Sequence, residues 1–148
     1  MTGQLISEVA ALTDGQTEEH PLEQAASIAV RFEDGTMGSI TVGRRVPESE
    51  NDAMIYGSHG RIALRGTLWE ACTGSLEVDT ETEQLTESYD GGLQELYKLQ
   101  IEAFSRAVES GQEFRASGRD GLRVVEVTSA IIESAATGRA VRVERVAF

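Results

Sequence analysis

The sequence predicts an α+β fold, namely an open, mostly antiparallel β-sheet with two main helices packed on one face, built as a single domain over residues 1–148. Three observations predict this class. Apolar residues alternate with a period of two through the first two thirds of the chain, and they recur at helical spacing in the last third. Strands and helices are therefore segregated along the chain rather than interleaved. A length of 148 residues also suffices for one domain with its own core.

The strands are expected to begin with Leu5–Thr13. Ile28, Val30 and Phe32 then alternate with polar or small residues, which is typical of a half-buried strand. The dipeptide Asp34–Gly35 supplies a hairpin turn, because glycine adopts positive φ at little cost. We expect the return strand to include Ile40–Val42.

A second hairpin is expected from Met54 to Leu64, around the turn Gly57–Ser58–His59–Gly60. Beyond this hairpin, the alternation of apolar and polar residues weakens. Short strand candidates remain at Leu68–Trp69 and Leu76–Val78, in a stretch rich in Thr, Glu, Gly and Ser. Such polar strands are common at the edges of antiparallel sheets.

The first helix is predicted by a stripe of apolar residues. Its members, spaced four, seven and four apart, are Leu93, Tyr97, Phe104 and Val108. This spacing places them on one face of an amphipathic helix. Ser110–Gly111 is expected to end the helix, because glycine suits the left-handed cap.

A second helix is predicted to start at Ser117, which forms a capping-box pattern with Asp120. Many β-branched residues between positions 122 and 136 favour a strand, whereas the length of the segment and a polar stripe favour a helix. The stripe comprises Arg119, Arg123, Glu126, Glu133 and Thr137. We therefore predict a helix with a wide buried face that ends at Gly138, followed by a final strand over Ala140–Val146.

Composition excludes several classes of function. The net charge of −12 disfavours binding to nucleic acid and to anionic membranes. No apolar run approaches the roughly 18 residues of a membrane span, and no signal peptide is evident, so we expect a cytoplasmic protein. Lys98 is the only lysine among thirteen basic residues. Both a genomic bias toward arginine and an adaptation to high salt would explain this acidic, arginine-rich chain.

The sequence predicts no catalytic, cofactor-binding or metal-binding residue. It contains no G-x-G-x-x-G fingerprint and no P-loop. His20 and His59 are expected in solvated loops, and Cys72, the single cysteine, has no partner for a disulfide. Arg44–Arg45 is expected at the end of a strand on the surface. Paired carboxylates are frequent by chance in so acidic a chain, at Glu18–Glu19, Glu48 with Glu50, and Glu81 with Glu83.

Three segments carry a resemblance to a known family. They are residues 29–40, residues 55–62, and residues 99–143, the last of which includes Ser117–Leu122 and Gly138–Val141. In their order and spacing they resemble the C-terminal domain of the Gfo/Idh/MocA family, named for glucose–fructose oxidoreductase and inositol dehydrogenase. The resemblance extends over residues 5–146, and its third segment is the most specific.

The resemblance implies a function. Members of this family have an N-terminal Rossmann domain that binds NAD or NADP and a C-terminal sheet domain that shapes the substrate cleft and forms oligomer contacts. Typical substrates are sugars, inositols and related polyols. This chain lacks the Rossmann half and the Glu-Lys-Pro motif with the catalytic lysine, and Lys98 cannot replace that lysine because it lies on the first predicted helix.

We therefore expect the substrate-side and oligomerisation domain of an NAD(P)-dependent sugar or polyol oxidoreductase, which cannot transfer a hydride alone. No cofactor is expected in this chain itself. The resemblance implies a homo-oligomer formed through the open sheet face, with a Rossmann domain present in a full-length parent or supplied in trans. Two alternatives stay open: a free-standing interaction or scaffold module, and a small enzyme that uses His20, His59 or the carboxylates.

Overall fold

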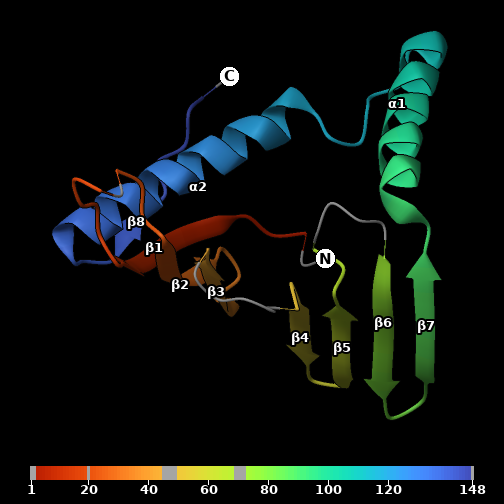
Figure 1. Ribbon diagram of the computed structural model, residues 1–148, viewed down its shortest axis with the longest axis horizontal. Helices are drawn as coiled ribbons and strands as arrows, with labels where there is room; N and C mark the ends of the chain where they lie inside the picture. The colour runs from red at the N-terminus through yellow and green to blue at the C-terminus, as the bar shows by residue number, and fades with distance from the viewer. Residues whose placement is uncertain (1–2, 20, 45–49, 69–72, 148) are drawn as a thin grey trace. The chain divides into compact units, whose positions relative to one another are not determined.

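The computed structural model describes residues 3–19, 21–44, 50–68 and 73–147. The chain divides into two compact units, which we describe separately. The first combines Met1–Pro47 with Ala116–Phe148, and the second is Glu48–Arg115. Each unit contains one helix and one four-stranded antiparallel sheet (Figure 1). The predicted α+β class, with antiparallel strands and two helices, is confirmed. The strands form two separate sheets, whereas the sequence predicts one.

The first unit contains three long strands, one very short strand and the second helix. These elements are β1 (Ile6–Thr13), β2 (Ala25–Phe32), β3 (Met37–Gly43), α2 (Gly118–Thr137) and β8 (Val141–Arg142). The strand order is β3-β2-β1-β8. Cross-strand register pairs Val9 with Val30 and Ala11 with Ile28, so period-two alternation gathers these four side chains on one face. This face is the core of the unit, with each side chain at most 7% exposed.

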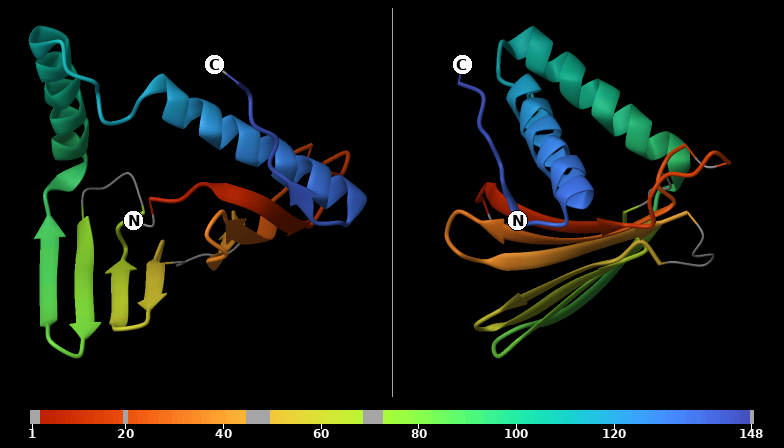
Figure 2. Two further views of the ribbon diagram at one scale, coloured as in Figure 1. Left: turned by 180° about the vertical axis from the view of Figure 1, so that it is seen from behind. Right: turned by 90° about the vertical axis from the view of Figure 1, so that its left-hand side faces the viewer.

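Helix α2 covers this core face, as Figure 2 shows. The capping box predicted at its start is present: the Ser117 hydroxyl accepts a hydrogen bond from the Asp120 amide, and the Asp120 carboxylate accepts one from the Ser117 amide. The Ser117 hydroxyl also donates to the Asp120 carboxylate, and this bond, followed by the one from the Ser117 amide, lowers the pKa of Asp120 below its usual range. Gly138 ends the helix in the left-handed conformation, as predicted.

The buried face of α2 is narrower than the sequence predicts. Ala130 is buried against the sheet, and Val127 and Ile131 are half-buried around it. In contrast, Val124 and Ile132 are each 66% exposed and do not belong to the core cluster. The prediction of a wide buried face is therefore wrong for this unit. Apolar content alone does not reveal which apolar stripe faces the sheet.

The predicted final strand is also shorter than expected. Only Val141 and Arg142 pair with β1, although the sequence predicts a strand over Ala140–Val146. The amide of Val143 still donates to the carbonyl of Ser7 on β1, whereas the amide of Val146 donates to Glu126 on α2 rather than to a neighbouring strand.

The second unit is a meander of four hairpin-linked strands followed by the first helix. The elements are β4 (Ala53–Gly57), β5 (Gly60–Arg65), β6 (Thr73–Thr80), β7 (Gln84–Asp90) and α1 (Gly92–Ser110). The hairpin around Gly57–Gly60 is confirmed, and the candidate at Leu76–Val78 extends to eight residues in β6. The strand candidate at Leu68–Trp69 is not confirmed, since Leu68 lies in a bend and Trp69 lies outside the described residues.

Strand β7 and helix α1 complete the unit. The sequence pattern did not single out β7, whose alternation is carried by one aliphatic side chain, Leu85. Pairing with β6 decides its conformation, because every residue from Gln84 to Asp90 has a partner in the register with β6. Helix α1 ends at Gly111 in the left-handed conformation, as predicted. Beyond the cap, the ring of Phe114 packs edge-on against Phe104, with 5.4 Å between the ring centroids.

Two glycines permit the close approach of β5 and β6. At Gly60, with φ at 148°, a Cβ atom would overlap the carbonyl oxygen of Asp79. At Gly74, with φ at 123°, a Cβ atom would lie 2.5 Å from the carbonyl oxygen of Arg65. Both positions therefore require a residue without a side chain. Gly57, in the same hairpin as Gly60, offers a control, because its Cβ would meet its nearest atom at 3.7 Å.

We expect Gly60→Ala and Gly74→Ala each to lower the free energy of unfolding by about 1–3 kcal/mol, because the backbone is strained and the neighbouring strand must move. Gly57→Ala should change it by less than about 0.5 kcal/mol. Urea denaturation followed by circular dichroism measures the three differences. Equal effects at Gly57 and Gly60 would contradict the close approach.

Candidate functional site

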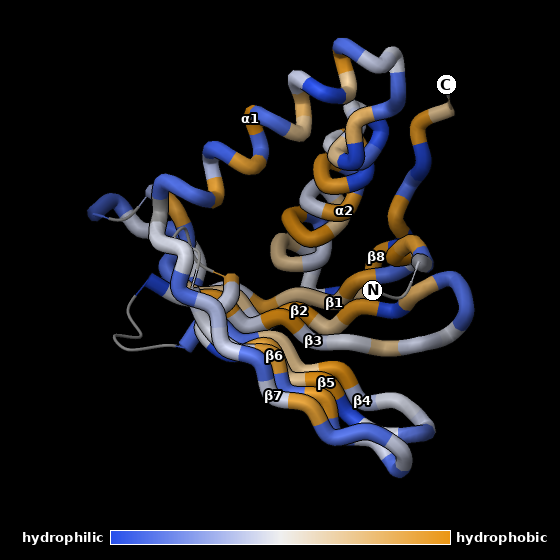
Figure 3. Tube along the Cα trace, turned by 90° about the vertical axis from the view of Figure 1, so that its right-hand side faces the viewer, coloured by the Kyte–Doolittle hydropathy of each residue, from blue (hydrophilic) through white to orange (hydrophobic). Residues whose placement is uncertain are grey.

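The sheet of the second unit has one apolar face. Register aligns Ile55, Ile62, Val78 and Leu85 in a single row across all four strands. Leu64 and Leu76 form a second pair beside this row. Figure 3 shows the corresponding orange segments recurring in neighbouring strands. We call these six half-buried side chains the apolar sheet face.

The opposite face of the same sheet is polar. Arg61 pairs with Asp79 at 3.3 Å, and Arg65 pairs with Glu77 at 3.0 Å. The hydrogen bond that Arg65 donates to Glu77 is the main cause that raises the pKa of Arg65, and the charges of Asp52 and Glu50 add to it. These pairs are half exposed, so each stabilises the sheet only modestly. A sheet with one charged face and one apolar face is suited to contact with solvent on one side and with another surface on the other.

The helix of the same unit does not shield the apolar sheet face. Figure 1 shows α1 continuing beyond the end of β7 rather than lying across β4–β7. Three members of the apolar stripe predicted for this helix, Tyr97, Phe104 and Val108, are between 51% and 67% exposed, and Ile101 on the same helix is 66% exposed. Both the helix and the sheet of this unit therefore present apolar surface that no element of the unit covers.

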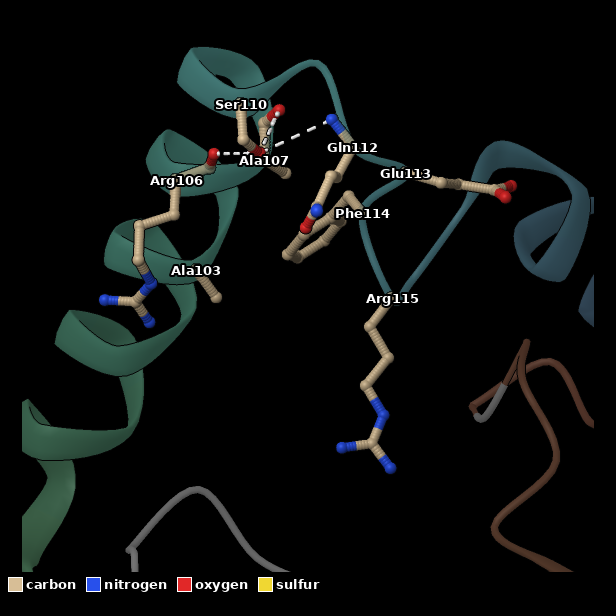
Figure 4. A pocket seen from close by; sticks show the side chains of 8 residues that line it. All are labelled: Ala103, Arg106, Ala107, Ser110, Gln112, Glu113, Phe114 and Arg115. Atoms are coloured by element: carbon tan, nitrogen blue, oxygen red, sulfur yellow. Dashed lines mark hydrogen bonds between the residues drawn. The ribbon is translucent and has the colours of Figure 1, made fainter.

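A shallow pocket of about 300 Å³ lies at the end of α1 (Figure 4). Ala103, Ala107 and Phe114 supply its apolar part, and Arg106 and Arg115 flank it. Every lining residue lies between positions 103 and 115, so the pocket is formed by one loop against its own helix. None of these side chains is buried. The pocket thus lacks the enclosed, convergent polar groups of a small-molecule site.

The first unit contains one buried carboxylate, Glu126, which is 6% exposed. Arg123 donates to both of its oxygens, at 2.9 and 2.8 Å. The Val146 amide and Arg145 donate at 2.8 and 3.1 Å. These bonds, led by the one from Arg123, lower the pKa of Glu126 from its ordinary 4.5 to about 2 despite burial.

Sequence reasoning missed the burial of Glu126, because it placed this residue on the polar stripe of the helix with Arg123. The prediction of a solvent-facing polar position is wrong for Glu126. The two arginines that pair with Glu126 in the structure, Arg123 and Arg145, are the sequence features that could have indicated a buried carboxylate. Only the tertiary structure brings Arg145, which lies nineteen positions away, to the same carboxylate.

The candidate residues within the described ranges lie on separate elements. His59 is exposed in the β4–β5 turn, and Lys98 is exposed on α1. Arg44 lies in an exposed turn after β3. His20, Arg45, Glu48 and Cys72 lie outside the described residues.

Within the described ranges, no group of three or more His, Cys, Asp or Glu side chains is arranged to hold a metal ion. Of the carboxylate pairs, Glu18–Glu19 and Glu81 with Glu83 are exposed, and Glu50 lies 3.9 Å from Arg65. In the same ranges, neither helix combines the length and apolarity that crossing a membrane requires. The described geometry thus offers surfaces for contact rather than a cluster of reactive side chains.

These features define an α+β domain with an open sheet whose surfaces are suited to packing. A family model for the C-terminal alpha/beta domain of the Gfo/Idh/MocA oxidoreductase family matches residues 1–143. The chain belongs to this family. The expectation from the sequence resemblance is thereby confirmed at the level of the family and the domain.

The named proteins that this chain matches are longer than the chain, and each is matched over only part of its length. The chain is 25% identical to D-xylose 1-dehydrogenase (NADP+) 2 of Haloferax volcanii over 134 residues, 89% of this chain and 40% of that protein. Among solved structures, aldose-aldose oxidoreductase from Caulobacter crescentus, complexed with glycerol, matches with a TM-score of 0.79 at 18% identity. An oxidoreductase from Agrobacterium radiobacter in complex with NAD+, L-tartaric acid and magnesium matches with a TM-score of 0.79 at 22% identity.

Each structural match covers 95% of this chain but only 42% and 44% of the matched chains. The chain therefore spans less than half the length of the relatives it resembles. At these identities the structural matches show that the fold is shared.

The low pKa of Glu126 predicts a pH dependence of stability. Its folded-state pKa lies below the ordinary value, so the carboxylate stabilises the fold fully above about pH 4.5, and this contribution is lost as the pH falls toward 2. We expect Glu126→Gln to lower the melting temperature clearly at pH 7, with a difference from the parent chain that shrinks as the pH approaches 2.

Glu133→Gln is the matched control, because Glu133 is an exposed carboxylate on the same helix. Thermal unfolding followed by circular dichroism between pH 2 and pH 7 compares the three proteins. A difference between parent and Glu126→Gln that is constant over this range would show that the charge of Glu126 does not stabilise the fold.

Proposed function

We propose that this chain acts as the substrate-side and oligomerisation domain of an NAD(P)-dependent sugar or polyol oxidoreductase. The observation that carries the proposal is the family match over residues 1–143, combined with the partial coverage of longer relatives. Those relatives include a D-xylose dehydrogenase described with NADP+, an aldose-aldose oxidoreductase, and an oxidoreductase bound to NAD+. A sugar or related polyol is accordingly the substrate class that we propose for the complete enzyme.

The chain by itself is proposed to be incompetent for hydride transfer. Its sequence contains no G-x-G-x-x-G fingerprint, which would place a pyrophosphate at a helix N-terminus. Its described residues present no cluster of reactive groups, and the one perturbed buried carboxylate is fully engaged by two arginines and an amide. The cofactor and the catalytic lysine would then belong to a Rossmann domain, and this chain would contribute the wall of the cleft and the contacts between subunits.

We expect the purified chain not to bind NADH or NADPH, because its sequence contains no dinucleotide fingerprint. Titration of each reduced cofactor, followed by its fluorescence, should show no saturable change up to about 1 mM, the upper end of ordinary enzyme affinities. Lactate dehydrogenase serves as a positive control for NADH. Saturable binding below that concentration would overturn the proposal that the cofactor site lies outside this chain.

The apolar sheet face is the proposed surface for self-association. Six aliphatic side chains lie together on it, whereas the opposite face carries ion pairs that would be costly to bury. With a net charge of −12, two copies repel each other at long range, so an apolar contact is needed to hold them together.

Neighbouring residues on β7 provide a matched test of this surface. Leu85 lies on the apolar sheet face and Thr86 on the opposite face. We expect the parent chain and Thr86→Glu to have a solution mass of at least twice the 16.0 kDa of one chain, and Leu85→Glu to shift toward the monomer, because a buried charge opposes the contact.

Light scattering after size exclusion gives the masses, and circular dichroism shows that each variant is folded. A monomeric parent chain would overturn the proposed self-association. A folded Leu85→Glu variant with the mass of the parent would place the contact on a different surface.

A further inference from the structure

The outer edge of β1 is closed by unrelated pieces of the chain rather than by a full strand. Only Glu8 and Val9 of this eight-residue strand pair with β8. At one end of the edge, the amide of Ala11 donates to the hydroxyl of Ser134 on α2 at 2.9 Å. That hydroxyl in turn donates to the carbonyl of Arg139 at 2.6 Å. A side chain thus takes the place of a neighbouring strand.

The other end of this edge is closed by the C-terminal segment. The amide of Val143 donates to the carbonyl of Ser7 at 2.9 Å. The guanidinium of Arg145 then donates to the carbonyl of Ile6 at 2.6 Å. Arg145 also lies 3.7 Å from Glu33. The backbone groups at the start of β1 are therefore satisfied by the segment that follows β8.

Apolar burial ends at Val143, which is 8% exposed. Glu144 and Ala147 are exposed, and Val146 is 56% exposed. Residues 144–147 are instead held by polar contacts, and two of these converge on Glu126, from the Arg145 guanidinium and the Val146 amide. Because charge-assisted hydrogen bonds to a buried carboxylate are strong and depend on geometry, one side chain holds the segment.

We propose that residues 144–147 form a strap, fastened by Glu126, which covers the Ile6 end of the β1 edge and opens separately from the sheet beneath it. Glu126 is buried on α2, so the fastening point moves with the core while the strap itself contributes little apolar surface. With the strap open, the carbonyl of Ile6 loses its donor and the end of the edge becomes available to pair with another strand. This inference concerns the first unit alone and does not depend on the proposed function.

Amide hydrogen exchange of the whole chain, measured by NMR, tests the strap. In Glu126→Gln we expect the amide of Val146 to exchange about tenfold faster or more than in the parent chain, since local opening sets its exchange rate. In the parent chain, the amides of Ile28 and Val30 in the core should exchange at least about tenfold more slowly than that of Val146, because they exchange only when the whole unit opens. Glu133→Gln, which changes an exposed carboxylate of the same helix, should leave all of these rates unchanged.

Arg145→Met provides an independent variant that leaves Glu126 paired with Arg123. It should accelerate exchange at Val146 in the same way, which keeps the test decisive if Glu126→Gln does not fold. Equal protection of Val146, Ile28 and Val30 in the parent chain would overturn the proposal, because the segment would then open only when the whole unit unfolds. Unchanged exchange at Val146 in both variants would overturn it as well, because the segment would not depend on the carboxylate.

Discussion

A carboxylate that is removed from water must be compensated by hydrogen bonds, and this constraint organises the first unit. Glu126 lies on the buried side of α2, where Arg123, Arg145 and the amide of Val146 all point to it. Satisfying this one group fixes the path of the chain after β8 and positions the guanidinium that serves the carbonyl of Ile6. The helix, the first strand and the C-terminal segment are therefore joined through one charged centre in addition to their apolar core.

The second unit is organised by register rather than by a buried charge. Because side chains alternate across a strand, the pairing of Ile62 with Val78 places the six side chains of the apolar sheet face on one side and the arginine–carboxylate pairs on the other. A shift of one residue would exchange the two faces. Gly60 and Gly74 maintain this register at the points of closest approach, where a side chain would meet the backbone of the neighbouring strand.

The buried carboxylate of the first unit and the strand register of the second are both consistent with the proposed role of this chain in contacts with other domains or subunits. The proteins that this chain matches are more than twice as long as the chain. The described residues offer an apolar sheet face and an exposed helical stripe, and the proposed role beside a catalytic domain would use both for contact. The net charge of −12 is concentrated on solvent-exposed carboxylates and leaves these apolar surfaces distinct from their surroundings.

Local sequence determined the strands and helices that have a clear hydrophobic period or a capping motif. Examples are the period-two alternation of Ile28, Val30 and Phe32 and the capping box of Ser117 with Asp120. Such patterns involve residues only a few positions apart, so they can be recognised in the sequence without knowledge of the fold. Tertiary structure alone decided the pairing of β7, the early end of β8, the narrow buried face of α2 and the burial of Glu126. Each depends on a partner far away in sequence, such as Arg145 for Glu126, and the free energy of such a contact cannot be read from local spacing.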